Sequence, residues 1–122
     1  MYIGNRNKII VDTKRFEYSL NYALTKIKTS PIKPYINDIY LYGSYARKQH
    51  RYNSDVDLLV ELNENININE FREEIFKLKG IVSPPDMDYP EVDLKIVIGN
   101  EWKTNKMLYY QNVKKEGIKI WE

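Results

Sequence analysis

The sequence predicts a small α/β (α+β) domain in which helices flank one small mixed β-sheet. Residues 55–62 and 91–98 alternate apolar and polar residues, as strands with one buried face do. Apolar residues recur at helical spacing over residues 13–28. The length of 122 residues fits a single domain, residues 1–122, and leaves no room for a second catalytic module.

The first half of the chain is predicted to form a helix, a strand and a short helix. Asp12 or Thr13 can cap a helix over residues 13–28. Its apolar positions are Phe16, Leu20, Ala23, Leu24 and Ile27. The β-branched and aromatic residues of 36–42 predict a strand. It stops at a Gly-Ser pair, after which residues 45–48 begin a short helix.

The strand predicted over residues 55–62 has two different faces. The residues expected to face the core are Val56, Leu58, Val60 and Leu62. The opposite face carries Asp55, Asp57 and Glu61, and we expect it to be exposed to solvent. The exposed face therefore opens with two carboxylates.

Two more helices and two more strands complete the prediction. Asn69 is expected to cap a helix that carries Phe71, Ile75, Phe76 and Leu78 and closes at Gly80. In the strand over residues 91–98, Asp93 and Lys95 share the polar face. The inward residues are Val92, Leu94, Ile96 and Ile98. A helix over residues 102–116 ends at Gly117, and residues 118–121 can add a short strand.

Composition excludes several classes of protein. Lys and Arg number 19 against 17 Asp and Glu, a net charge of +2, which is too mild for a protein that coats nucleic acid. The chain contains no cysteine, and therefore no disulfide or zinc–thiolate site. No apolar run approaches a membrane span, and the N-terminus lacks a signal-peptide core. We therefore expect a cytoplasmic protein.

Three aspartates are candidates for a metal site. Asp55 and Asp57 are two residues apart on one strand face, with Cα atoms roughly 6–7 Å apart. Asp93 takes the same kind of position on a later strand. Mg²⁺ takes a few carboxylate oxygens together with substrate phosphates. If the two strands are neighbours, the three carboxylates meet. An isolated Asp-x-Asp is more often a pair of solvated acids on the wet face of a strand.

The pair Gly43-Ser44 lies about one strand upstream of these acids. A strand that ends in Gly-Ser and enters a helix offers backbone N–H groups, a hydroxyl and the positive end of a dipole to an anion. Taken alone, a Gly-Ser dipeptide is a turn in most proteins. Beside paired carboxylates that can hold Mg²⁺, it completes a candidate nucleoside triphosphate site.

These residues resemble the signature of the DNA polymerase β-like nucleotidyltransferase superfamily. That signature is Gly-Ser-x-Ala-Arg-Gly, a short spacer, and Ser-Asp-x-Asp-Leu-x-Val. The chain has Gly-Ser-Tyr-Ala-Arg-Lys over 43–48 and Ser-Asp-Val-Asp-Leu-Leu-Val over 54–60. Val-Asp-Leu at 92–94 resembles the site of the third carboxylate, and Lys48 stands where the family usually has a second glycine. In size and in its closing residues 115–121 the chain is similar to minimal nucleotidyltransferases.

The resemblance implies a mixed sheet with the active site on its open edge, and a role for each matched residue. Asp55 and Asp57 would hold two Mg²⁺ ions that bridge the triphosphate of ATP. Asp93 would complete the second metal site and activate the acceptor hydroxyl. Gly43 and Ser44 would cradle the β- and γ-phosphates. An acceptor hydroxyl would attack the α-phosphate, and pyrophosphate would leave.

Several further residues have a functional and a structural interpretation. Arg47 could neutralise phosphate charge or lie on the surface, and Lys95 is a similar candidate. His50 is expected to be a solvated loop residue. Asp86 and Asp88 could compete with Asp93 for the third carboxylate, but their proline-rich loop has no strand periodicity. Of the pair Tyr109-Tyr110, which could stack a base or a partner, one is expected in the core.

Three functions remain open at this stage. Small members of the family are often encoded beside a HEPN-domain ribonuclease as the antitoxin half of a toxin–antitoxin pair. The first is therefore transfer of AMP from ATP to a tyrosine hydroxyl of a partner HEPN toxin, with nucleic acid an unlikely acceptor. The second is an antitoxin that neutralises its partner by binding, with catalysis weak or absent. The third is a nucleotidyltransferase for a small molecule.

Overall fold

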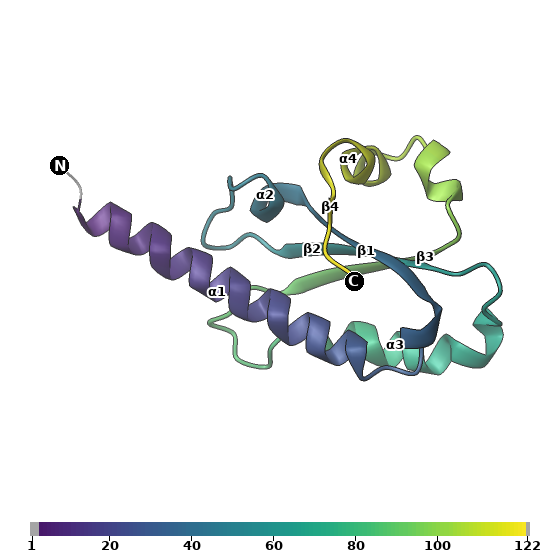
Figure 1. Cartoon of the computed structure of the whole chain (residues 1–122). Helices are drawn as coiled ribbons and strands as arrows, with labels where there is room; N and C mark the ends of the chain where they lie inside the picture. The colour runs from purple at the N-terminus through teal and green to yellow at the C-terminus, as the bar shows by residue number, and fades with distance from the viewer. Residues whose placement is uncertain (1–2, 122) are drawn as a thin grey trace.

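The computed structural model describes the backbone of residues 3–121 and the side chains of residues 13–121. It contains one four-stranded sheet with helices on both faces (Figure 1). The helices are α1 (Ile3–Lys28), α2 (Gly43–Ala46), α3 (Arg72–Ile81) and α4 (Leu108–Glu116). The strands are β1 (Ile36–Tyr42), β2 (Val56–Leu62), β3 (Val92–Ile98) and β4 (Ile118–Lys119). The predicted α/β class and its mixed sheet are confirmed.

The strand order is β3-β2-β1-β4. β1 runs antiparallel to β2 and to β4, whereas β2 and β3 are parallel. Parallel neighbours need a crossover connection, and α3 lies within the connection from β2 to β3. The strands over 55–62 and 91–98 are therefore neighbours, as the convergence of their aspartates requires.

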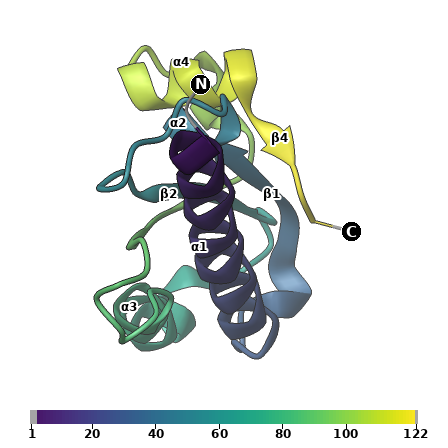
Figure 2. The same cartoon turned by 90° about the vertical axis from the view of Figure 1, so that its left-hand side faces the viewer.

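Helices α1 and α3 cover one face of the sheet, which we call the core face. Figure 2 shows α1 crossing this face with α3 beside it and α4 on the far side. The core face is defined by Val56, Leu58, Val60 and Leu62, all fully buried. Phe16, Ala23 and Ile27 of α1 pack in the same cluster and are also fully buried. The alternation predicted for this face is confirmed.

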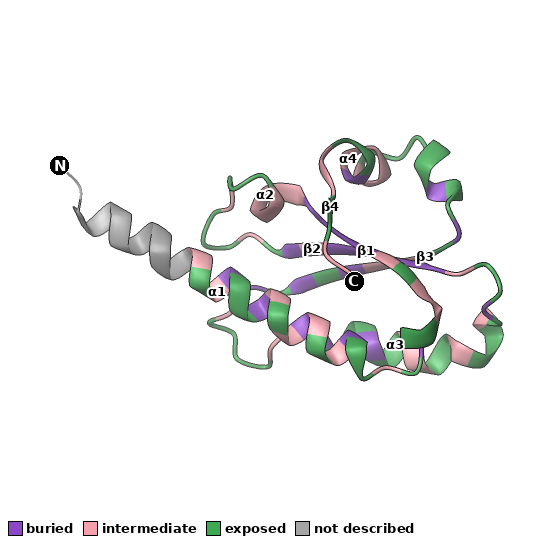
Figure 3. Ribbon diagram, in the orientation of Figure 1, coloured by how far each residue is buried: buried purple, intermediate pink, exposed green. Residues whose placement is uncertain are grey.

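The opposite face, which we call the site face, is not simply solvent-exposed as predicted. Its residues on the two central strands are Asp38, Tyr40, Tyr42, Asp57, Leu59 and Glu61. Trp102 and Val113 pack against Tyr40, Tyr42 and Leu59 to form a second, smaller apolar cluster. Glu61 is only 6% exposed and accepts a hydrogen bond from Trp102 Nε1 at 2.8 Å. Figure 3 shows buried residues continuing along the middle of the sheet on these strands.

Three helix boundaries differ from the predictions. α1 begins at Ile3, so neither Asp12 nor Thr13 caps it. Residues 3–12 include glycine and asparagine, which are weak helix formers. A 3-10 turn over Ile68–Phe71 precedes α3, so Asn69 is not its cap, and α3 continues through Gly80 to Ile81.

The helix predicted over residues 102–116 is interrupted. A 3-10 turn covers Glu101–Thr104, and α4 starts only at Leu108. Between them Asn105 is extended, and its side chain accepts a hydrogen bond from the backbone N–H of Met107 at 2.9 Å. Asparagine competes with helix geometry by such local bonds. The end predicted at Gly117 is confirmed.

Two apolar residues placed inward or on a packed helix face are more exposed than predicted. Ile98 ends the edge strand β3 and is 41% exposed, and Phe76 of α3 is 81% exposed. β3 has no neighbour on its outer side in the described sheet, so its last residue has little to pack against. None of the described helices has both the length and the apolar character that a membrane crossing needs.

Candidate active site

The predicted site residues lie at one end of the sheet, where β1 ends and β2 and β3 begin. Asp57 pairs in register with Tyr42 of β1 on one side and with Asp93 of β3 on the other. Neighbouring strands are about 4.8 Å apart and paired residues point to the same face. Tyr42, Asp57 and Asp93 therefore form one row across the site face. Asp55 precedes β2 by one residue and is exposed.

Gly43 brings the turn after β1 against the carboxylate of Asp57. Its φ angle is +81°, a region that glycine adopts without strain. A Cβ atom at this position would overlap Asp57 Oδ2. Both observations require glycine here, because the backbone conformation and the close approach each exclude a side chain. Ser44 follows, and no side chain caps the N-terminus of α2.

The short helix α2 gives a weaker dipole than the sequence interpretation assumed. It contains only the four residues Gly43–Ala46, whereas a macrodipole is the sum of many aligned peptide units. A phosphate at Ser44 would be held by local N–H groups and the hydroxyl. Lys48, which replaces the family's second glycine, has a φ angle of 60°. The chain therefore keeps a glycine-like backbone at this position with a lysine side chain.

Asp57 is partly buried and lies close to two other carboxylates. Burial raises its pKa to about 6, and the negative charges of Asp93 and Asp55 add to the rise. Lys95 and Arg47 act in the opposite direction. Burial, followed by the charges of Glu91 and Asp93, also raises the pKa of Asp55. A cation placed among these carboxylates would relieve the repulsion.

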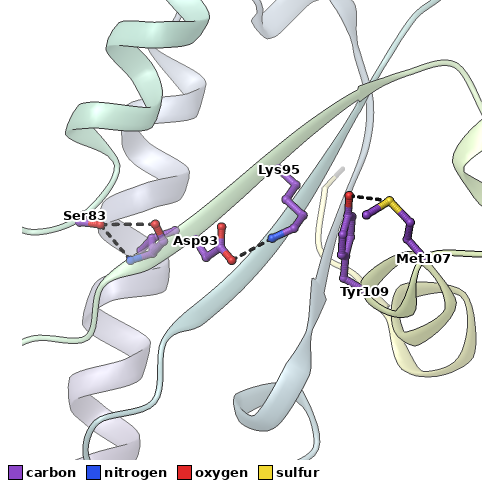
Figure 4. A network of polar contacts seen from close by, with 6 residues as sticks. Ser83, Asp93, Lys95, Met107 and Tyr109 are labelled. Carbon is purple, nitrogen blue, oxygen red and sulfur yellow. Dashed lines mark hydrogen bonds and ion pairs between the residues drawn. The ribbon is translucent and has the colours of Figure 1, made fainter.

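Lys95 supplies part of that positive charge. Its Nζ lies 2.9 Å from Asp93 Oδ2, and the two side chains extend along the same face of β3 (Figure 4). Partial burial acts to lower the pKa of Lys95, but the hydrogen bond to Asp93 and the nearby Tyr42 outweigh it and raise the pKa. Lys95 Nζ also lies 4.9 Å from the centre of the Tyr109 ring. The only sequence signal for this ion pair was the shared strand face.

Tyr42 is a site-face residue that the sequence interpretation missed. It is 4% exposed, and its hydroxyl has no hydrogen bond of good geometry among the described residues, although Lys95 is near enough to act on it as a donor. Burial raises its pKa to about 12, while the positive charge of Lys95 acts to lower it. Its position directly before Gly43 was the only sequence signal that could have indicated a role. Its hydroxyl is a polar group available beside the row of aspartates.

The remaining candidates are placed as follows. Arg47 is on the surface, paired with Glu116 at 2.7 Å, and close enough to Asp57 for its charge to act there. Asp86 accepts a hydrogen bond from the backbone of Asp88 within an exposed loop turn. The register of β2 and β3 thus aligns Asp93 with Asp57 and leaves those two acids in their loop.

His50 and the tyrosine pair differ from expectation. His50 is half-buried, not solvated: its ring lies 4.4 Å from that of Phe16 and 5.2 Å from that of Tyr45. The non-local contact with α1 could not be inferred from the loop sequence. Tyr109 and Tyr110 are both half-buried against the cluster of Trp102, so neither is a fully buried core residue.

Comparison with known proteins agrees with this geometry. The family model described as polymerase beta, nucleotidyltransferase matches residues 26–122. The chain belongs to this nucleotidyltransferase family. The match contains β1, the Gly-Ser turn and all three aspartates, so the resemblance predicted from the sequence is confirmed.

Solved structures support the same fold. One is a nucleotidyltransferase-like protein from Sulfolobus solfataricus, at 15% identity and a TM-score of 0.55, with 93% of this chain and 86% of that chain covered. Another is a toxin–antitoxin complex with AMP-PNP, at 24% identity and a TM-score of 0.51, with 83% of this chain and 71% of that chain covered. No curated protein sequence matches the chain.

Proposed function

We propose that this chain is a Mg²⁺-dependent nucleotidyltransferase that transfers AMP from ATP to a tyrosine hydroxyl of a partner HEPN-domain toxin and thereby acts as an antitoxin. One observation carries the proposal. Asp57 and Asp93 stand in register on adjacent parallel strands, with the turn at Gly43 directly against Asp57. Family membership supplies the reaction class.

No three acidic residues of the described chain form a ready-made metal-binding group, but those at this end of the sheet fit Mg²⁺ by their chemistry. Asp55, Asp57 and Asp93 offer only carboxylate oxygens, the hard ligands that Mg²⁺ prefers. Lys95 already places a positive charge against Asp93. We assign all three aspartates as ligands of two ions. When bound, Mg²⁺ would supply the positive charge that the triphosphate and the acceptor oxygen need.

The protein's own groups then have defined tasks. Gly43 and Ser44 hold the β- and γ-phosphates through backbone N–H groups and the hydroxyl. Arg47 lies on the surface at the end of α2 and can add charge to the triphosphate. The acceptor oxygen forms a bond to the α-phosphorus, the bond from that phosphorus to the bridging oxygen breaks, and pyrophosphate leaves. Asp93 would take the acceptor proton.

Two considerations favour a protein acceptor. Asp55 and Asp93 are exposed, so a hydroxyl on a bulky partner can reach them. Within residues 3–121, no second domain encloses a small substrate. The fold is shared with a toxin–antitoxin complex determined with AMP-PNP, which supports both a toxin partner and an adenine nucleotide. The partner that neutralisation requires would also supply the missing wall of the site.

Label transfer tests the proposal. The purified protein is incubated with Mg²⁺, α-labelled ATP and the HEPN-domain toxin, and the label on the toxin is counted. The double variant Asp55→Asn/Asp57→Asn is expected to reduce transfer by at least about 100-fold, because charge stabilisation of the transferred phosphoryl group is lost. The matched control Asp86→Asn/Asp88→Asn makes the same chemical change in the exposed loop and should transfer normally.

The other outcomes separate the alternatives. A stable complex without label would mean neutralisation by binding. Equal transfer by the site variant and the loop variant would contradict the assignment of Asp55 and Asp57. Label on a small molecule, with none on the toxin, would favour the small-molecule enzyme.

A further inference from the structure

The Asp93–Lys95 ion pair occupies one of the two oxygens that Asp93 offers to the proposed metal site. Lys95 Nζ contacts Asp93 Oδ2 at 2.9 Å, with the lysine side chain 28% exposed and the aspartate 47% exposed. Asp93 stands in the row with Asp57. An ammonium group and a divalent cation repel each other, so they compete for the charge of this carboxylate. Cation binding therefore favours a move of Lys95 away from Asp93.

The second observation is a polar group that could receive the displaced lysine. The buried hydroxyl of Tyr42 has no hydrogen bond of good geometry among residues 13–121. Tyr42 and Lys95 lie on the same face of the sheet, one row apart, and Lys95 is already near enough to act on the Tyr42 hydroxyl through its charge and as a hydrogen-bond donor. An unsatisfied buried hydroxyl costs free energy. A closer approach of the Lys95 ammonium would satisfy it.

The third observation is the aromatic wall beside Lys95. Its Nζ lies 4.9 Å from the centre of the Tyr109 ring (Figure 4), within the range of a cation–π interaction. The methylene stem of Lys95 can stay against this wall while its head moves from Asp93 toward Tyr42, so the exchange needs only side-chain rotation.

We propose that Lys95 is an internal counter-cation, bound to Asp93 in the metal-free protein and exchanged to the Tyr42 hydroxyl when a divalent cation binds Asp57 and Asp93. Lys95 and Tyr42 are thus positioning residues that set the affinity for the metal in opposite directions. Lys95 competes with the cation, and Tyr42 stabilises the displaced lysine. The inference rests on the proposed function, because it needs a cation at these aspartates.

Mn²⁺ binding without nucleotide tests the exchange. Free Mn²⁺ is counted by electron paramagnetic resonance in titrations of the wild-type chain and single variants. Lys95→Met should tighten Mn²⁺ binding roughly threefold to tenfold, the range expected for removal of one contacting charge from a partly exposed site. Tyr42→Phe should weaken it about twofold to threefold, since the displaced lysine loses its acceptor.

Lys119→Met is the matched control for loss of charge. Lys119 also lies on the site face, across Tyr40 and Leu59 from Lys95, and its ion-pair partner is Asp38 at 3.8 Å. Its removal changes the net charge equally without freeing Asp93, so Mn²⁺ affinity should change by less than about twofold. Lys95→Arg keeps the charge and should stay near the wild-type affinity. Thermal unfolding checks that each variant folds.

A measurement on the wild-type chain gives a readout without mutation. The Cε resonance of Lys95, followed by NMR during a Mg²⁺ titration, should shift with the midpoint of metal binding, while that of Lys119 stays in place. Equal Mn²⁺ affinity of the wild type and Lys95→Met would overturn the exchange and leave the proposed function standing, as would an equal gain in Lys119→Met. Absence of Mn²⁺ binding in every variant would overturn both the exchange and the proposed metal site.

Discussion

The two faces of the sheet are built from the same strands but in different ways. On the core face, successive inward residues of β2 are apolar and fully buried beneath α1 and α3. On the site face, the alternate residues of the same strand are Asp57, Leu59 and Glu61, and the cover is the smaller cluster of Trp102 and Val113. One face holds the fold together, and the other keeps polar groups half-buried.

This difference explains where chemistry is possible. A fully apolar face gives stability but no charge. Half-burial strengthens the interactions of Asp57 with its neighbours, because less water screens them. The site face therefore carries carboxylates where the core face carries apolar side chains, and it contributes less to stability. Variants on the two faces should behave differently.

The largest effect is expected from a pair of adjacent leucines. Leu58 faces the core face and Leu59 the site face, and both are fully buried. Leu58→Ala should lower the free energy of unfolding by about 3–4 kcal/mol, and Leu59→Ala by about 2 kcal/mol, because the smaller cluster can relax around the cavity. Urea unfolding followed by Trp fluorescence measures both. Equal losses would mean that the two faces are packed equally well.

A smaller loss is expected when the buried polar contact of the site face is removed. Glu61→Ala leaves the Trp102 Nε1 donor, now bonded at 2.8 Å, without its acceptor. The expected cost is about 1–3 kcal/mol in the same urea assay. Glu61→Gln keeps an acceptor and should cost less than about 1 kcal/mol. A large loss in Glu61→Gln would show that the carboxylate charge itself is needed.

The same contrast decides how much could be predicted from the sequence. Alternation located β2 and β3, because burial beneath α1 and α3 leaves a regular apolar pattern, and β-branched and aromatic residues located β1. The placement of Glu61 was wrong, because its cover comes from Trp102, 41 residues away in the chain, and no local pattern reports that contact. The prediction that His50 is a solvated loop residue was wrong for the same reason, because its ring lies against that of Phe16 in α1.

The candidate site was more predictable than its surroundings. The Gly-Ser turn and the three aspartates form a dense local signature, and the parallel register of β2 and β3 places Asp57 beside Asp93 as that signature implies. Lys95 and Tyr42 were not predictable as a unit, because their proximity depends on the register of three strands. Local sequence thus indicates the candidate ligands, whereas the sheet determines what surrounds them.

The ionisation of Asp57 on the site face should make the free energy of unfolding depend on pH. The pKa of Asp57 rises from an ordinary 3.8 to about 6 on folding. Below pH 3.8 the Asp57 carboxyl is protonated in both the folded and the unfolded chain, so its ionisation does not lower the free energy of unfolding. Between about pH 4 and 6 the unfolded chain ionises first, and the free energy of unfolding falls. Above pH 6 the penalty is complete, about 1–2 kcal/mol after allowance for partial exposure.

Asp57→Asn tests this cost. With EDTA present, the variant should be about 1–2 kcal/mol more stable than the wild type at pH 7.5 and nearly equal at pH 3.5. Asp86→Asn, in the exposed loop, should show no such difference. A gain that is the same at both pH values would come from packing and not from the ionisation of Asp57.

The smallest effects are expected from one backbone substitution at the site end of the sheet and one over the core face. Lys48, after α2 at the site end, holds a φ angle of 60°, which costs a non-glycine residue free energy. Gly80, in α3 over the core face, has open space around its Cα. Lys48→Gly and Gly80→Ala should therefore each stabilise the fold by about 0.5–1 kcal/mol, the first by relieving strain and the second by reducing the freedom of the unfolded chain.

Thermal unfolding measures both gains, and label transfer shows whether either substitution also changes activity. If Lys48→Gly gains stability and keeps full transfer, the strain at Lys48 has no part in catalysis. If transfer falls while Gly80→Ala keeps it, the strained lysine belongs to the phosphate-binding turn.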